Sequence, residues 1–232
     1  MPANTTSDIK QADLYIGLGI NRLSYVIYNG GDKLFTSAGS NRPGISHTFG
    51  SIAYNKSFES AVINFLADND LDSKAFRSVR ILMENHLFTI VPENLFEESK
   101  QEHYITLNQD IMPEVDYTFR NDHIQRAKLH NVYAMPASLW NFLNKNFPTP
   151  TIRHQVSTLI ESINEPGLYV NILNSQVDLF LKSQRVELCQ SYPVQNREDI
   201  LYHIIHVAEQ SGYDLKRKPV ILLGLINKNA AD

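Results

Sequence analysis

The sequence predicts an α/β protein built from two similar lobes, each opening in a three-strand meander. Two segments, 14–34 and 168–188, align without a gap, and each contains an apolar strand, a tight turn and a second apolar strand. In both halves a helical pattern and a buried strand follow the meander. The matched apolar residues are Leu14-Tyr15-Ile16 with Leu168-Tyr169-Val170, and Tyr25-Val26-Ile27 with Leu179-Phe180-Leu181. Two such halves would face each other across a cleft.

In the first half, strands are expected over 14–18, 23–28 and 33–36. Asn29-Gly30 between the last two is the signal for a hairpin turn with positive φ. Apolar residues at three-to-four spacing behind Ser57 predict a capped helix over 57–67. A short strand is expected over 79–83, a brief helix from Pro92 through 96, a strand over 132–135, and a helix from Pro136 to near 148.

The second half repeats this order. A helix over 156–163 precedes strands over 168–173, 177–181 and 186–192, and a helix follows that begins near Asn196 and ends at Gly212. A buried strand over 220–223 completes the half. Meander, helix and strand are the elements of an RNase H-like unit, and two such units form the actin-like architecture. We therefore expect a first lobe over 13–150, with a polar insert near 97–126, and a smaller second lobe over 151–228.

Composition excludes several function classes. The 232 residues are 43% hydrophobic with a formal net charge of −4, so no global positive field attracts nucleic acid. Residues 1–13 are polar and no apolar run approaches the roughly 18 residues of a membrane helix, so membrane insertion is not expected. Cys189 is the only cysteine, which fits a reducing cytoplasm. A cytoplasmic protein with a protein partner is the expectation.

Several stretches of the chain resemble an uncharacterised bacterial family, domain-of-unknown-function family 3822 (DUF3822). The resemblance runs over 14–226, and more remotely the chain is similar to actin-like ATPases of the sugar kinase, Hsp70 and pilus-assembly type. It implies a two-lobed fold. The stretches that carry it are Phe76-Arg77-Ser78-Val79, Val132-Tyr133-Ala134-Met135-Pro136, Leu168-Tyr169-Val170-Asn171, and the segments 90–96 and 199–205.

The resemblance also implies a nucleotide site, in which each meander turn supplies an aspartate with a glycine two residues later. The carboxylate binds magnesium or its waters, and the bare amides approach the phosphates. Here the aspartate positions fall on Gly17 and Asn171, although Gly19 is kept, and Gly224 ends the strand similar to the adenosine-contacting one. We therefore expect Gly19, Asn171 and Gly224 to be vestigial nucleotide-site positions, with no catalytic residues, metal or cofactor.

Two functions from different classes follow. Removing one preorganised polar contact commonly costs about 2.7 to 4 kcal/mol of transition-state stabilisation, so losing both carboxylates predicts a non-catalytic scaffold or interaction protein. The alternative is a nucleotide-binding ATPase or small-molecule kinase with a rebuilt phosphate site. In that case Asp13, Asp32 or Asp178 would supply the carboxylate, although strand alternation makes it as probable that Asp178 faces solvent.

Three other features have a structural and a functional interpretation. His203 and His206 are three apart on a predicted helix, but no third ligand is evident, so packed or exposed histidines are favoured over a metal site. Cys189 would need one of these histidines to act as a nucleophile, and a buried thiol is favoured. Short alternating apolar runs in the insert predict strands there. The insert also carries Tyr104, Tyr117 and Phe119, which either anchor a partner or cover the core.

Overall fold

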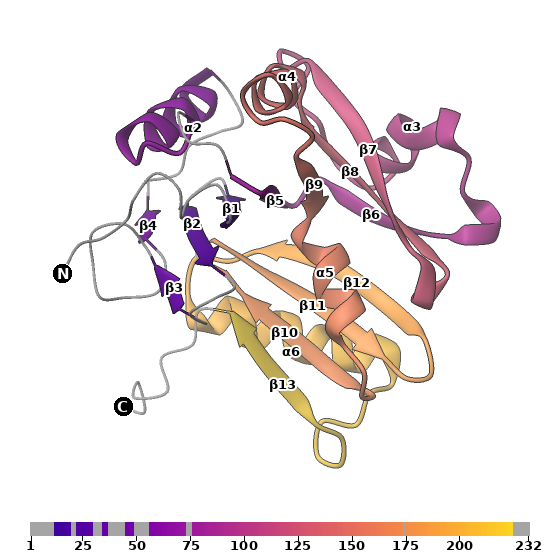
Figure 1. The fold of residues 1–232 in the computed structure, drawn as a ribbon. Coiled ribbons are helices and arrows are strands. Elements are labelled where there is room, and N and C mark those ends of the chain that lie inside the picture. Colours follow the sequence, from indigo (N-terminus) through magenta and orange to yellow (C-terminus); the bar gives the residue numbers. More distant parts are fainter. Residues whose placement is uncertain are drawn as a thin grey trace.

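The computed structural model describes residues 12–19, 22–29, 34–36, 45–48, 56–72, 76–173 and 175–224. Within these ranges the chain forms three sheets flanked by helices (Figure 1). Gly30, Asp32 and Leu225 lie outside the described residues, so the takeover by Asp32 that the sequence left open is not addressed.

The first sheet contains the first meander. Its strands are β1 (Asp13–Gly19), β2 (Arg22–Asn29), β3 (Leu34–Thr36), β4 (Ile45–Thr48), β5 (Ser78–Glu84) and β9 (Thr151–His154). The order is β3-β2-β1-β5-β9, and β4 also pairs with β2. β1 is antiparallel to β2 and parallel to β5, and α2 (Lys56–Asp68) connects the meander to β5. The helix begins one residue before the expected cap, Ser57.

The second sheet repeats this topology. It consists of β10 (Gly167–Ile172), β11 (Gln176–Lys182), β12 (Val186–Pro193) and β13 (Val220–Gly224), in the order β12-β11-β10-β13. β10 is antiparallel to β11 and parallel to β13, as β1 is to β2 and β5. The helix α6 (Arg197–Ser211) begins where the Asn196 side chain accepts a hydrogen bond from the Asp199 amide, and it ends at Gly212 with φ 65°.

The third sheet is an insert between β5 and β9. It consists of β6 (Phe88–Pro92), β7 (Tyr117–Ile124) and β8 (Leu129–Pro136), in the order β6-β8-β7. The insert is therefore larger than the expected polar stretch near 97–126. Where alternating residues predict strands, the chain forms α3 (Gln101–Thr106), because Ile105 packs onto Val91 and Val132 of the sheet. Three short 3-10 helices also belong here: η1 (Glu93–Leu95), η2 (Glu98–Lys100) and η3 (Gln125–Ala127).

Two helices connect the insert to the rest of the chain. α4 (Ala137–Asn146) follows β8, and α5 (Gln155–Ser162) follows β9. β9 comes after residue 150 but pairs in parallel with β5, so it extends the first sheet. The expected division of the chain into lobes after residue 150 stays a prediction.

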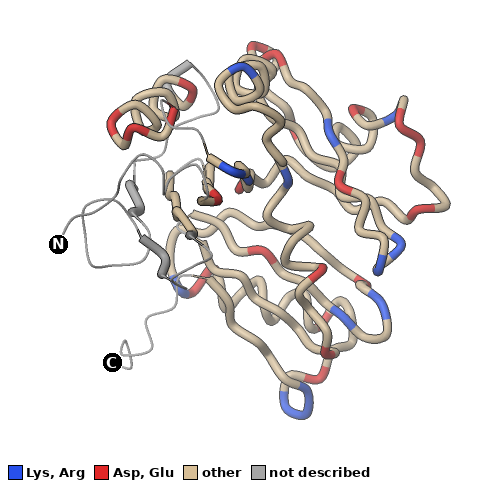
Figure 2. Tube along the Cα trace, viewed as in Figure 1, with Lys and Arg blue, Asp and Glu red and all other residues tan. Residues whose placement is uncertain are grey.

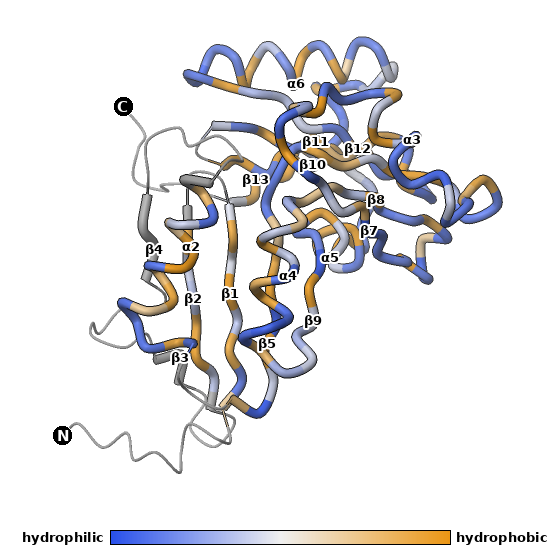
Figure 3. Tube along the Cα trace, turned by 90° about the horizontal axis from the view of Figure 1, so that it is seen from above, coloured by the Kyte–Doolittle hydropathy of each residue, from blue (hydrophilic) through white to orange (hydrophobic). Residues whose placement is uncertain are grey.

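The two lobes share one hydrophobic core. Tyr169 and Phe180 of the second sheet belong to the same buried cluster as Ile16 and Ile81 of the first sheet. A second cluster, which includes Val170, fills the space between the second sheet and α6 on its outer face (Figure 3). Direct apolar packing therefore connects the two lobes.

Candidate functional site

The positions that the resemblance assigns to a nucleotide site lie at corresponding strand ends of the two lobes. Gly17 and Gly19 are at the C-terminal end of β1, and Asn171 is near the C-terminal end of β10. Gly224 ends β13 and stands opposite Ile172 in the parallel register. In open α/β sheets, ligands bind at the carboxyl ends of strands. These two strand ends are therefore the candidate site.

At Gly17, an aspartate would have to displace neighbouring side chains. A Cβ atom at this position would lie 2.6 Å from Ser24 Oγ and 3.2 Å from Glu84 Oε1. Ser24 is its cross-strand neighbour on β2, and Glu84 ends β5 on the other side of β1. The space in which an aspartate side chain would start is thus occupied by a hydroxyl and by a carboxylate from the next strand.

Asn171 is paired with a buried carboxylate. It stands directly opposite Asp178 in the β10–β11 ladder, and its Nδ2 donates a 2.9 Å hydrogen bond to Asp178 Oδ2. Gln176 Nε2 donates to the other oxygen, Oδ1, at 3.0 Å. Strand alternation left the orientation of Asp178 open. The residue is 1% exposed and points into the protein, because its face of β11 packs inward.

Burial also sets the protonation of Asp178. Removal of the carboxylate from water raises its pKa from 3.8 to about 6, and the hydrogen bond from Asn171 acts in the opposite direction. The negative charge of Glu84 raises the pKa further. Glu84 of the first lobe and Asp178 of the second therefore lie near enough to repel each other across the junction of the lobes.

The backbone conformation at position 224 favours glycine. Its φ is 86°, and a Cβ atom would lie 2.2 Å from the carbonyl oxygen of Ile172 and 2.9 Å from Asn171 Oδ1. The space freed by the missing side chain is thus filled by β10. Asn171 on β10 therefore bonds to Asp178 on β11 and lies beside Gly224 at the end of the edge strand β13.

Asp13 does not take the place of a missing aspartate. It begins β1, at the opposite end from Gly17, and the Arg77 guanidinium binds both of its oxygens while Ser78 Oγ donates at 2.7 Å. The hydrogen bond from Arg77 lowers the pKa of Asp13 to about 2. This carboxylate is part of a structural ion pair between β1 and the start of β5.

Sequence reasoning missed Glu84. It ends a strand parallel to β1 and stands opposite Gly19 in the register. The position could have been found, because neighbouring parallel strands bring their carboxyl ends to the same edge of a sheet. Both positions at which the resemblance implies an aspartate therefore have a carboxylate on an adjacent strand, Glu84 beside Gly17 and Asp178 beside Asn171.

A buried cluster of polar side chains contains a serine, a histidine and an aspartate, but it is not a catalytic triad. Ser157 Oγ donates directly to Asp122 Oδ2 at 2.6 Å, and the backbone amide of His154 donates to the same oxygen at 2.8 Å. Asn131 Nδ2 bonds to Ser157 Oγ, and His154 Nε2 bonds to the carbonyl oxygen of Asn85. The imidazole is therefore not positioned between the hydroxyl and the carboxylate, as a triad requires.

All five residues of this buried polar network are enclosed, with Ser157 and Asn131 at 0% exposure. Burial lowers the pKa of His154 to about 3 and raises that of Asp122. The members come from β7, β8, β9, α5 and the segment after β5, so the network attaches the insert to the first sheet. Asn131 Oδ1 is buried without a hydrogen-bond partner among the described residues, but the hydrogen bonds that the other groups form favour one arrangement of the elements that carry them.

The histidines of α6 have aromatic neighbours. His203 stacks on Tyr192 with ring centroids 4.3 Å apart, and His206 stacks on Tyr202. Among the described residues, only a different group brings three metal-ligating atoms together. Cys189 packs against the main core, on the face of the second sheet away from α6, and burial raises the pKa of its thiol. A cysteine–histidine pair is therefore not formed.

The aromatic residues of the insert are half-buried. Tyr104 and Phe119 pack on the cluster formed by Val91, Ile105 and Val132, and the Tyr104 hydroxyl donates to the carbonyl oxygen of Leu95 at 2.7 Å. They serve the core of the insert. Positive and negative side chains are interspersed along the described chain, with a short basic run at 216–218 between α6 and β13 (Figure 2).

The duplicated topology and the paired strand ends define an actin-like α/β protein. A solved structure from Bacteroides thetaiotaomicron, described as a protein with actin-like ATPase fold and unknown function, matches with a TM-score of 0.83. The match covers 98% of this chain and 87% of that chain at 19% identity. This likeness confirms the predicted fold and, at such low identity, shows the fold alone.

The chain belongs to the family described as protein of unknown function (DUF3822), whose model matches residues 2–231. The predicted family is thus confirmed. No match was found among curated proteins.

Two other solved structures are less similar, with TM-scores below 0.5. The cytoplasmic domain of EpsL, an inner membrane component of the type II secretion system of Vibrio cholerae, has a TM-score of 0.49 at 9% identity, over 94% of this chain and 84% of that one. An exopolyphosphatase from Cytophaga hutchinsonii has a TM-score of 0.47 at 10% identity, over 91% and 66%. Within the described part of the present chain, none of the helices combines the length and apolar character needed to cross a bilayer.

Proposed function

We propose that this protein is a non-catalytic, cytoplasmic actin-like interaction protein whose nucleotide site is filled by its own side chains. The observation that supports this most directly is the filling of the strand ends. Ser24 and Glu84 occupy the space at Gly17, and Ile172 and Asn171 occupy the space at Gly224. Gly19, Asn171 and Gly224 are, in this proposal, remnants of nucleotide-binding positions.

Electrostatics support the same proposal. A nucleoside triphosphate brings several negative charges, and two unit charges 4 Å apart repel by about 4 kcal/mol at the effective dielectric constant near a protein surface. Glu84 would confront those charges from the first lobe, and Asp178 is buried with a donor on each oxygen. Binding would have to displace these hydrogen bonds before a metal could reach Asp178.

The test is binding of magnesium and ATP to the purified full chain. A ligand present at a hundred times its dissociation constant stabilises the folded state by about 2.7 kcal/mol, so binding gives a clear rise in melting temperature. We expect no rise with ATP, ADP or inorganic polyphosphate, and no phosphate release. A saturable stabilisation by any of these nucleotides would refute the proposal.

A second candidate is a nucleotide enzyme with a rebuilt metal site, and one observation favours it. Glu84 and Asp178 each lie on the strand next to a vacated aspartate position, and the raised pKa of Asp178 is typical of functional sites. In this case Glu84→Gln and Asp178→Asn should each abolish metal-dependent ATP binding. Glu209→Gln on the exposed face of α6 is the matched control and should leave such binding unchanged.

The partner surface of the leading proposal can be tested on two groups of exposed apolar residues. The insert exposes Leu95 (61%) and Leu107 (63%), and α6 exposes Leu201 (57%) and Tyr202 (62%). We expect the insert to carry recognition, through these leucines instead of its half-buried aromatics. A partner bound by the native chain should then be lost in Leu95→Glu/Leu107→Glu and retained in Leu201→Glu/Tyr202→Glu, with both melting temperatures unchanged. The reverse pattern would assign binding to α6.

A further inference from the structure

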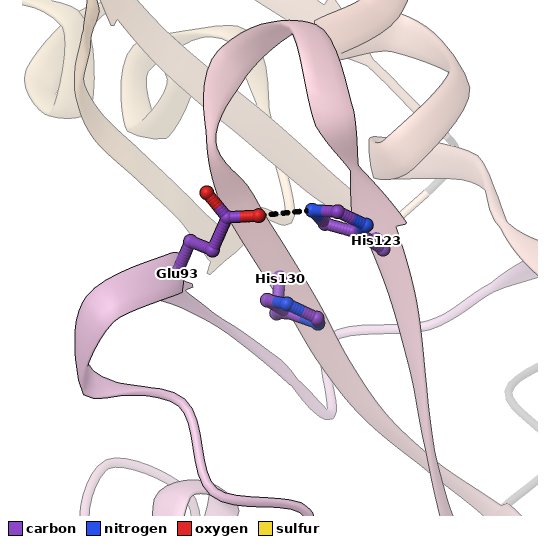
Figure 4. A group of neighbouring side chains, drawn as sticks. All are labelled: Glu93, His123 and His130. Atoms are coloured by element: carbon purple, nitrogen blue, oxygen red, sulfur yellow. Dashed lines mark hydrogen bonds and ion pairs between the residues drawn. The ribbon is translucent and has the colours of Figure 1, made fainter.

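Three side chains with metal-ligating atoms converge on the insert, away from the strand ends described above. They are Glu93, His123 and His130, and their nearest ligand atoms all lie within 4.8 Å of one another (Figure 4). His123 Nε2 is 2.7 Å from Glu93 Oε1. Within the described residues this is the one such group.

The backbone of the third sheet brings these residues together. His123 on β7 and His130 on β8 are direct cross-strand partners, and such pairs have Cβ atoms about 4.5 to 5.5 Å apart. Glu93 follows β6 on the other side of β8, and its amide donates to the carbonyl oxygen of Lys128 at 3.0 Å. The three ligands thus come from β7, from β8 and from the start of η1 directly after β6, with His130 of β8 in the middle.

The surroundings of His130 prepare it as a ligand. Its Nδ1 is 2.9 Å from the carbonyl oxygen Oδ1 of Asn121, which can only accept, so Nδ1 carries the proton and Nε2 has its lone pair free. Phe96 stacks on the ring with centroids 3.8 Å apart and an interplanar angle of 4°, which fixes its orientation.

We propose that Glu93, His123 and His130 form a binding site for a divalent transition metal, with zinc as the ion. Two imidazoles and one carboxylate form a ligand set suited to zinc, whereas magnesium and calcium prefer oxygen ligands alone. The His123 and Glu93 side chains are 41% and 46% exposed, so the ion can enter from solvent. Three protein ligands leave a fourth position for water or for a group from a partner.

Binding requires one defined movement. The rings of His123 and His130 are stacked, with centroids 4.5 Å apart and an interplanar angle of 9°. An ion bound through ring nitrogens lies in the plane of each ring, and two nearly parallel planes cannot both contain it. The exposed side chain of His123 therefore rotates when the ion binds. Its ring leaves the stack with His130, and its Nε2 binds the ion instead of Glu93. The ring of His130 stays in place against Phe96.

The experiment is titration of the untagged, chelator-treated full chain with zinc by calorimetry, and with cobalt by visible absorption. We expect one ion per chain, a micromolar dissociation constant, and a cobalt spectrum of tetrahedral intensity. Affinity should fall at least tenfold in His123→Ala, Glu93→Gln and His130→Phe, the last of which keeps an aromatic ring against Phe96. Asn121→Ala should weaken binding by roughly tenfold, because the native Asn121 side chain orients His130 without touching the ion.

His206→Ala on α6 is the control and should bind zinc as the native chain does. Circular dichroism confirms that each variant is folded. The proposal is refuted if the native chain shows no saturable binding at one equivalent, or if His123→Ala and His130→Phe bind zinc as tightly as the native chain. Failure here would leave the proposed interaction function untouched, because the site is separate from the inter-lobe strand ends.

Discussion

Replacing Asp178 by asparagine should stabilise this protein at neutral pH, although it removes a hydrogen-bonded carboxylate. The pKa of Asp178 rises from 3.8 to about 6 on folding, chiefly because the group is buried. Each pKa unit corresponds to about 1.36 kcal/mol, so the ionised carboxylate lowers the free energy of unfolding by roughly 3 kcal/mol. Asparagine fits the same space and carries no charge.

The pH dependence has a definite direction. Below pH 3.8 the carboxyl group is protonated in both states and has no such effect. Between pH 3.8 and about 6 the unfolded chain loses the proton while the folded chain keeps it, so the stability of the native protein falls. Above about pH 6 the destabilisation is complete. The advantage of Asp178→Asn should therefore develop between pH 4 and 6 and remain constant above this range.

Part of the gain is lost because asparagine places an amide NH2 group, which cannot accept a hydrogen bond, opposite Asn171 or Gln176, both of which donate to Asp178. One lost hydrogen bond costs about 1 kcal/mol, which leaves roughly 2 kcal/mol. For a chain of this length, this corresponds to a rise in melting temperature of roughly 4 to 8 °C. Thermal melts followed by circular dichroism between pH 4.5 and 8 would measure it.

Two further variants test the reasoning. Glu84→Gln removes a charge that raises the pKa of Asp178, so it should reduce the pH dependence of the native chain. Asp110→Asn, on the exposed surface of the insert, should change the stability by less than about 0.5 kcal/mol at every pH. If Asp178→Asn is less stable than the native chain by the same amount at pH 5 and pH 8, burial does not control this carboxylate and the argument fails.

Three other predictions concern four variants. Asp13→Asn should lower the free energy of unfolding by roughly 2 kcal/mol at pH 7, because the hydrogen bond from Arg77 holds the pKa of this carboxyl group at about 2. Urea titrations should show that the difference between the variant and the native chain shrinks as the pH falls from about 4 towards 2. Gly224→Ala should cost more than about 2 kcal/mol, whereas Gly212→Ala, with φ 65° but no atom within 4 Å of its Cβ, should cost only about 1 kcal/mol in the same assay. Ser157→Ala removes a 2.6 Å hydrogen bond in the buried polar network and should cost about 1 to 3 kcal/mol by chemical denaturation; no measurable loss would show that water replaces the hydroxyl.

The sequence determined the repeated part of the fold because its signals are local. The strands of both meanders alternate or are continuously apolar, and α6 has a polar N-cap at Asn196 and a glycine at its C-terminal end. The duplication aligns Gly17 with Asn171, and the resemblance to actin-like ATPases implies an aspartate at both positions. Family and architecture follow from these residues.

The insert could not be predicted as well. α3 was expected to be extended, because Tyr104 and Ile105 lie in a short alternating run, and β9 was missed because its four residues give too little periodicity. Contacts with the sheet decide both elements. α3 forms because its buried Ile105 meets apolar residues of β6 and β8, and β9 forms because it completes the edge of the first sheet beside β5.

The candidate sites were decided by tertiary structure alone. Glu84 and Asp178 are more than ninety positions apart in the chain, and only the shared core of the two lobes brings their charges within reach of each other. Likewise, Glu93 joins His123 and His130 only because β8 lies between β6 and β7. Residue patterns determine the conformation of a segment, but charge coupling and metal coordination depend on distances in space, which are fixed by the pairing of strands distant in sequence.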